Sequence, residues 1–307
     1  MPERYTKIMG EIAPIAEVLE NEGISAEEVC SLISTSSKES PNGQTYFDLE
    51  DGQGSFREKR YLKNIISGPL DVDQMDYLQR DAYYTGVAHG TIDVDRLMQT
   101  VAIAHGGLAI HKSGLVAVEG LMVARSLMYT SVYFHKTVRI AEMMLCKAID
   151  AVPPSILNDA HLNTDSALSL ALENTNEDSQ RIMTLLNYRR LYKKALSETA
   201  SSLDDEQRKR LIEVADYKKR KQKEIEIADR AGVSHSDVTL DIPSKSILLE
   251  ELTIGKTEVP VLDNGRVRTL SKYSPQARSV HDWAFLVSSP QRYVEDVRKA
   301  AAKVLFD

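Results

Sequence analysis

SGPLDVDQMDYLQRD, residues 67–81, is the stretch that decides how the first half of the chain folds. Gly68 and Pro69 interrupt the preceding segment, and Asp71 is placed to cap a new helix. Gln74 follows three residues later, as in a capping box, in which the two side chains satisfy backbone N–H groups at the helix start. The stretch therefore predicts a helix that begins immediately after Asp71.

One face of this predicted helix carries a mixed set of polar side chains. At 3.6 residues per turn, two carboxylates, two phenols and a guanidinium share one stripe, at Asp73, Tyr77, Arg80, Asp81 and Tyr84. Such a stripe could face a cleft that binds a metal ion or a phosphorylated ligand. The alternative is a capped surface helix with internal Asp/Arg pairs, and spacing leaves both open.

Composition limits the class of protein. The 307 residues, 42% of them hydrophobic, are enough for one large domain or two modest ones. Two cysteines cannot form a disulfide framework, and we find no apolar run of about 18 residues that could cross a membrane, so we expect a cytoplasmic protein. The net charge of −7 argues against broad binding to nucleic acid or to an anionic membrane. We expect small anionic ligands.

Helices dominate the elements that the sequence predicts. The expected helices cover residues 3–20, 25–34, 58–66, the helix after Asp71, 94–104, 119–149, 178–198, 204–230 and 291–305. A loop is expected at 35–56, a hairpin from 108–111 and 115–118, and strands at 238–242, 258–262 and 266–270. Pro153 and Pro154 end the longest helix, and the composition shifts after them. We therefore predict two domains, 1–151 and 152–307, in a mainly α fold whose later part is a smaller α+β region.

A second informative stretch is ARSLMYTSVYFHK, residues 124–136. Arg125, Tyr129, Tyr133 and Lys136 recur there at helical spacing. A guanidinium can bind phosphate oxygens through a fork of N–H donors, and tyrosine rings offer an aromatic surface to a sugar or a base. The stretch predicts a helix face that contacts a nucleotide.

Together the two stretches resemble the HD superfamily of phosphohydrolases. Residues 67–86 are similar to the segment that supplies the family's last metal ligand. Residues 124–136 are similar to the phosphate- and sugar-contacting helix of the branch of SAM-and-HD-domain dNTP triphosphohydrolases, and weaker similarity continues at 189–193 and 238–243. The resemblance implies the later helices of an HD core, followed by the α+β region. It also implies an oligomeric enzyme that hydrolyses a deoxynucleoside triphosphate to deoxynucleoside and triphosphate.

The resemblance implies roles for the residues of the first stretch. Asp73 would be a catalytic residue as a ligand of a divalent metal ion, which could be Mg, Mn, Fe, Ni or Zn. Tyr77 and Asp81 would orient the phosphate and the sugar hydroxyl of the substrate. The alternatives are a carboxylate that complements the helix dipole for Asp73, and a buried tyrosine with an intrahelical ion pair for the other two.

Roles in the second stretch follow from the same resemblance. Arg125 would be a catalytic residue that binds phosphate, Lys136 would neutralise phosphate charge, and Tyr133 would lie against the sugar. Tyr129 replaces a histidine of the better-known relatives, so its role as a substrate contact stays open. Three further residues resemble positions that some relatives use for a regulatory nucleotide, with surface bases as the alternative: Arg96, Arg189 and Lys193.

The chain departs from the family pattern before residue 60. The family's first histidine and its His-Asp doublet should lie there, but the first histidine of this sequence is His89. The doublet His281-Asp282 follows the pattern by its letters only, and we do not expect a metal site there. We expect the chain to be the C-terminal portion of an HD enzyme, inactive by itself, whose missing ligands a longer gene or a separate chain supplies. The alternative is a non-catalytic nucleotide-binding or assembly subunit.

Overall fold

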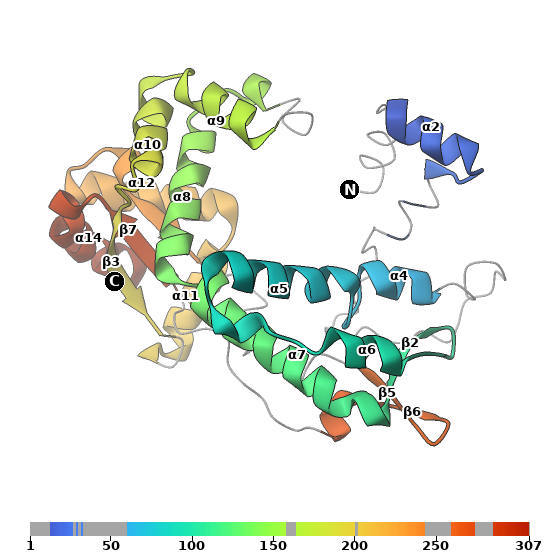
Figure 1. The fold of residues 1–307 in the computed structure, drawn as a ribbon. Coiled ribbons are helices and arrows are strands. Elements are labelled where there is room, and N and C mark those ends of the chain that lie inside the picture. The colour runs from blue at the N-terminus through green and yellow to red at the C-terminus, as the bar shows by residue number, and fades with distance from the viewer. Residues whose placement is uncertain are drawn as a thin grey trace. The chain divides into compact units, whose positions relative to one another are not determined.

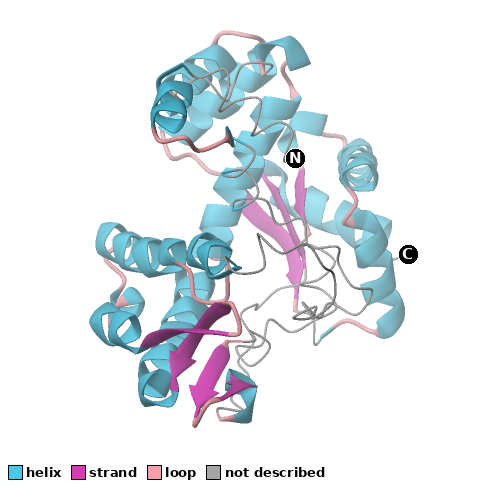
Figure 2. Cartoon of the chain, turned by 90° about the vertical axis from the view of Figure 1, so that its right-hand side faces the viewer, coloured by secondary structure: helices cyan, strands magenta, loops and turns pink. Residues whose placement is uncertain are grey.

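A computed structural model describes residues 13–26, 29, 32, 60–157, 164–199, 202–242, 259–273 and 285–306. It divides into two compact units, Met1–Arg125 with Ile254–Ala277, and Ser126–Thr253 with Arg278–Asp307. Helices dominate both units, and each contains one small sheet (Figures 1 and 2). The predicted mainly α fold with an α+β region is confirmed. The domain boundary that we predicted at residues 151/152 stays a prediction.

Two helices of the first unit begin at the predicted caps Asp71 and Asp93, although the predicted helix 94–104 ends at Thr100. The unit contains α2 (Ala13–Asn21), α4 (Arg60–Ile66), α5 (Val72–Thr85), α6 (Val94–Thr100) and the larger part of α7 (Leu115–Met128). Asp71 caps α5, as predicted, by accepting a hydrogen bond from the backbone N–H of Gln74 at 2.8 Å. The buried core of this unit draws on α5, α6, β2 and α7 through Leu78, Leu97, Ile110 and Leu121.

The first unit's sheet contains β1 (Val101–Ala104), β2 (Gly107–His111), β5 (Pro260–Asp263) and β6 (Arg266–Thr269), in the order β1-β2-β5-β6. Strands β1 and β2 are antiparallel, β2 and β5 are parallel, and β5 and β6 are antiparallel. The predicted turn between β5 and β6 is confirmed, since Asn264 and Gly265 have φ of 50° and 75°.

The hairpin predicted from 108–111 and 115–118 is wrong. The strand at 107–111, β2, pairs instead with β1, which directly precedes it. The two strands are joined by a two-residue turn in which His105 and Gly106 have φ of 52° and 75°. The other edge of β2 is occupied by β5. Because neither edge is available to the following residues, the chain leaves the sheet through a short 3-10 helix at Lys112–Gly114 and enters α7.

Residues of the second unit form α8 (Lys136–Asp150), α9 (Asp165–Glu173), α10 (Glu177–Asn187), α11 (Asp205–Val214), α12 (Tyr217–Ala231) and α14 (Val294–Phe306). The predicted helix 178–198 is wrong at its end, because Arg189 adopts a φ of 54° and the chain continues as a strand. The predicted helix 204–230 is two helices, since Asp216 caps a new one with its carboxylate.

The second unit's sheet has the order β3-β7-β4, with β3 (Lys193–Glu198), β4 (Thr239–Asp241) and β7 (Phe285–Ser289). Both outer strands are antiparallel to β7. Successive residues of β7 point to opposite faces. Phe285 and Val287 enter the core shared with α12 and α14, whereas Leu286 enters the core shared with α8 and α10. The sheet therefore lies between two helical layers.

Several sequence predictions fall on residues outside the described ranges, and one prediction concerns membrane-spanning helices. Most of the predicted helices 3–20 and 25–34, the loop 35–56 and the His281-Asp282 doublet lie outside the described residues. Within the described residues, one helix, Lys112–Tyr133, is long and apolar enough to cross a membrane by length and composition, in contrast to our expectation from the sequence. Core helices of soluble proteins pass the same test, so this is weak evidence for a membrane span.

Candidate nucleotide-contacting residues

The start of α5 is fixed by a set of buried polar contacts. Asp71 accepts the backbone N–H of Gln74, and the Gln74 side-chain amide donates to the Gly68 carbonyl at 3.0 Å and to the Asp71 carboxylate at 3.1 Å. In a capping box, the Gln74 side chain would accept a hydrogen bond from the backbone N–H of the N-cap residue. Here its amide donates instead to the Gly68 carbonyl and to the capping carboxylate. These contacts hold the first turn of α5, which carries Asp73.

Along α5, the predicted stripe divides into two groups. Asp73 is exposed in the first turn, and Tyr77 and Asp81 follow on the same face, one and two turns later, each half-buried. Arg80 instead forms an exposed ion pair with Asp76 on the same helix, as the alternative interpretation anticipated. Asp73, Tyr77 and Asp81 therefore remain the candidate residues of this helix.

A π-helix interrupts the long helix that the sequence predicted over 119–149. After α7, residues Tyr129–Tyr133 form a π-helical turn in which the Phe134 N–H donates to the Tyr129 carbonyl at 2.8 Å. The Tyr129 and Tyr133 rings meet edge to face, with centroids 4.9 Å apart and an interplanar angle of 69°. The prediction of one unbroken helix is therefore wrong, and the wider turn changes the register between Arg125 and Lys136. Single π-helical turns are frequently found at functional sites.

Lys136 begins a new helix directly after this turn. His135 has extended backbone angles, and its Nδ1 accepts a hydrogen bond from the Thr137 N–H at 3.3 Å, so it is the N-cap of α8. Lys136 is exposed at the first helical position, and Arg125, in the last turn of α7, is half-buried. Tyr129 and Tyr133 therefore lie in the π-helical turn, and Lys136 lies shortly after it, at the start of α8.

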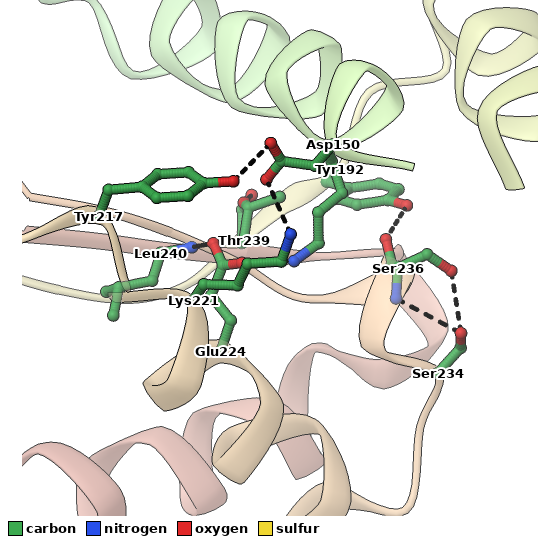
Figure 3. A network of polar contacts seen from close by, with 11 residues as sticks. Asp150, Tyr192, Tyr217, Lys221, Glu224, Ser234, Ser236, Thr239 and Leu240 are labelled. Carbon is green, nitrogen blue, oxygen red and sulfur yellow. Dashed lines mark hydrogen bonds and ion pairs between the residues drawn. The ribbon is translucent and has the colours of Figure 1, made fainter. Parts of the chain in front are cut away.

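Ion pairs attach α8 to the rest of its unit at intervals along its length. Arg139 binds Asp241 of β4 through two hydrogen bonds, Nε–Oδ2 at 2.7 Å and Nη2–Oδ1 at 2.8 Å, which raise the pKa of the guanidinium. Lys147 pairs with the buried Glu224, whose other oxygen accepts the Leu240 N–H at 2.8 Å. Near the end of α8, Asp150 binds α12 through Tyr217 and a lysine, as Figure 3 shows.

A second polar network surrounds Tyr192 and was not predicted from the sequence. The buried Tyr192 hydroxyl donates to the Ser236 carbonyl at 2.9 Å (Figure 3), and burial raises its pKa to about 12. Arg181 pairs with Asp237 at 2.9 Å and donates to the Ser236 hydroxyl at 2.8 Å. These partners lie far apart in the sequence, so no local pattern could have indicated the network.

The residues proposed for a regulatory nucleotide are divided between the units. Arg96 lies in the first unit, where its guanidinium donates to the Ser113 carbonyl at 2.9 Å. Arg189 and Lys193 lie in the second, at the end of α10 and at the first position of β3, and both are exposed. Their shared role stays a prediction.

The described residues do not fit a complete metal site. No group of three or more His, Cys, Asp or Glu side chains gathers in the described part of the chain. Asp73 offers one carboxylate, whereas metal sites in proteins take several such ligands. We therefore assign no metal-dependent step to the described residues.

The comparisons with known proteins show one family, through a family model. A family model for the HD associated region matches residues 92–306. Two curated relatives are similar over shorter segments: the uncharacterized protein MJ1154 of Methanocaldococcus jannaschii is 42% identical over 99 residues, and the uncharacterized protein YwfO of Bacillus subtilis is 41% identical over 92 residues. These segments cover 31% and 30% of this chain but only 22% and 21% of the relatives.

Among solved structures, a hypothetical protein from Aquifex aeolicus matches with a TM-score of 0.63 at 22% identity, over 96% of this chain and 70% of that chain. The similarity shows a shared fold. A phosphohydrolase from Bacteroides thetaiotaomicron gives a TM-score of 0.48 at 21% identity, over 90% of this chain and 75% of that chain. A similarity at that level establishes neither a fold nor an activity.

Proposed function

The chain belongs to the HD-associated region family, and from this we propose that it supplies nucleotide-contacting residues to a metal-dependent HD phosphohydrolase that acts on deoxynucleoside triphosphates. The observation that carries the proposal is the π-helical turn at Tyr129–Tyr133, which lies inside the family match and interrupts the helix at the stretch where the sequence suggests phosphate and sugar contacts. A π-helical turn replaces the regular α-helical hydrogen bonds, and such turns are rare and frequently lie at functional sites. Its position therefore supports a functional role for this stretch.

We assign the proposed contacts residue by residue. The Arg125 guanidinium and the Lys136 ammonium would neutralise phosphate charge, the former through two donors and the latter as a point charge. Tyr133 would lie against the sugar, with Tyr129 as its edge-to-face neighbour. On α5, Tyr77 and Asp81 would orient the phosphate and the sugar hydroxyl.

Asp73 would contribute one ligand to a divalent metal ion. A metal ion in such an enzyme supplies charge for the phosphoryl oxygens and lowers the pKa of a bound water. The remaining ligands would come from the histidine and His-Asp motifs of the family, in a longer form of the protein or in a separate chain. We further propose a cytoplasmic homo-oligomer.

A second candidate function is a non-catalytic nucleotide-binding or assembly subunit. The lack of a complete metal donor set among the described residues favours it. The first candidate requires nucleotide binding, whereas an assembly subunit does not. The two candidates also differ in whether Asp73 is needed for turnover by an assembled enzyme.

Nucleotide binding can be tested by calorimetry with dGTP. We expect the parent chain to bind and Arg125→Ala to bind about 10- to 100-fold more weakly, because a charge-assisted hydrogen-bonded contact contributes roughly 1.5–3 kcal/mol. Arg298→Ala is the matched control, since Arg298 is an exposed arginine of α14 paired with Glu295. It removes the same charge and should leave the affinity unchanged. Undiminished binding by Arg125→Ala would remove this residue from the site.

A further inference from the structure

The break between the π-helical turn and α8 leaves the first turn of α8 with few buried side chains. Residues 135–138 are exposed, Arg139 is half-buried, and Ile140 is the first buried residue of the helix. The Arg139 N–H donates to the His135 carbonyl at 3.1 Å, which closes that first turn. The position of Lys136 therefore depends on what holds the beginning of α8.

Arg139 provides that attachment. Its guanidinium makes two hydrogen bonds to the carboxylate of Asp241, whose side chain is only 2% exposed. Asp241 lies on β4, opposite Leu286 of the central strand. A two-bond contact fixes the orientation of the guanidinium as well as its distance from the carboxylate. The pair therefore connects the first turn of α8 directly to the sheet.

The charge of Arg139 is already matched within the protein. Asp241 and Glu142 both contact its guanidinium. If the Arg139 guanidinium left these two carboxylates to bind a phosphate, the buried carboxylate of Asp241 would lose its ion-pair partner, which would cost free energy. A direct contact between Arg139 and a ligand is therefore disfavoured, in contrast to the exposed Lys136 three residues earlier.

We infer that Arg139 and Asp241 are a positioning pair, which holds Lys136 in place for triphosphate binding by attaching the first turn of α8 to the sheet. This inference rests on the proposed function. The pair itself touches neither phosphate nor sugar. Its effect on binding should therefore pass through Lys136.

The structure offers a matched control on the same helix. Glu224 is also a buried carboxylate that pairs with a basic residue of α8, Lys147, but that contact lies just over two turns further along the helix. Asp241→Asn and Glu224→Gln each neutralise one buried carboxylate. Both should lower the stability of the chain, and only Asp241→Asn should loosen the first turn of α8.

Hydrogen exchange and calorimetry on the full 307-residue chain test the inference. For Asp241→Asn we expect the backbone N–H groups of residues 134–140 to exchange about tenfold faster, and the dissociation constant for dGTP to rise about tenfold, the factor that corresponds to about 1.4 kcal/mol. For Glu224→Gln we expect both quantities to stay within about twofold of the parent. In a Lys136→Ala background, adding Asp241→Asn should weaken binding no further.

Exchange at residues 134–140 that is unchanged in Asp241→Asn, or equally accelerated in Glu224→Gln, would overturn the inference. Additive losses of affinity in the Lys136→Ala background would overturn it as well. Failure of the parent chain to bind dGTP would instead overturn the proposed function, and hydrogen exchange would still decide whether the pair holds α8. If Asp241→Asn does not fold, Arg139→Lys replaces it, because lysine keeps the charge but cannot form the two-donor contact.

Discussion

The substitution Tyr192→Phe should make the chain less stable than the parent at pH 8 and more stable than the parent at pH 12. In the folded chain the buried hydroxyl donates to the Ser236 carbonyl at 2.9 Å, and its pKa is about 12. In the unfolded chain the pKa of tyrosine is about 10. Because the folded pKa is raised, the stabilisation from this hydroxyl is fully present below pH 10 and is lost as the pH rises toward 12. A shift of about two units corresponds to about 3 kcal/mol.

At pH 8, the variant should be less stable than the parent by about 1 kcal/mol, the net contribution of one buried hydrogen bond. At pH 12, where the folded hydroxyl is half ionised, the parent has lost about 2.3 kcal/mol that the variant cannot lose, so the variant should be the more stable protein by about 1 kcal/mol. Urea unfolding followed by circular dichroism at pH 8, 10, 11 and 12 measures the difference. The lysines titrate in the parent and in the variant alike, so their contribution cancels from the difference in stability.

The result that would refute this reasoning is a constant difference between the parent and Tyr192→Phe across that pH range. It would mean that the hydroxyl is solvated in the folded chain and that the network around Ser236 does not bury it. A reversal of sign between pH 10 and 12 is the expected outcome.

Two further predictions concern the fold that carries the proposed contacts. Gly114→Ala should lower the free energy of unfolding by about 2 kcal/mol or more, because its Cβ would lie 2.2 Å from the Thr100 hydroxyl and 2.7 Å from the Ile110 side chain. Gly120→Ala, in the same stretch but with nothing within 4 Å, should instead stabilise α7 by about 0.5–1 kcal/mol, and equal effects of the two changes on the melting temperature would contradict the packing at Gly114. Asp71→Ala should lower the free energy of unfolding by about 1 kcal/mol in urea, since α5 loses its cap, and an unchanged midpoint would show that the cap contributes nothing.

Local signals in the sequence predicted elements well where a cap or a turn residue determines the structure. Asp71 and Asp93 cap α5 and α6 through their carboxylates, and Asn264-Gly265 forms the tight turn of a hairpin. Each of these features depends on the conformational preference of one or two residues. Such preferences can be read without knowledge of the tertiary structure.

Elements that depend on distant partners were predicted less well. β2 was assigned to the wrong hairpin because its true hairpin partner β1, residues 101–104, was predicted as the end of the helix 94–104. The other neighbour of β2, the parallel strand β5, lies about 150 residues later in the chain. The predicted helix 178–198 contains β3, a strand that exists because it pairs with β7. A helical period at 193–198 cannot compete with that pairing once the sheet forms.

The candidate site was predicted in its residue types but not in its local geometry. Regular helical spacing placed Arg125, Tyr129, Tyr133 and Lys136 on one face, whereas the π-helical turn and the new cap at His135 change the register between them. The attachments of α8 were not predicted at all. Asp241 and Glu224 come from elements about 80 to 100 residues beyond the helix they hold, so no sequence period relates them to it.

Reconstitution of hydrolysis tests whether Asp73 completes the metal site of an HD phosphohydrolase. We would mix this chain with a polypeptide that carries the histidine and His-Asp motifs of an HD phosphohydrolase, add dGTP with Mn or Mg, and measure released triphosphate by chromatography. We expect activity in the mixture that neither chain has by itself, loss of that activity in Asp73→Asn, and full activity in Asp76→Asn, which changes an exposed aspartate of the same helix that pairs with Arg80. Full activity of the Asp73→Asn mixture, or robust turnover by the parent chain without a partner, would contradict this expectation.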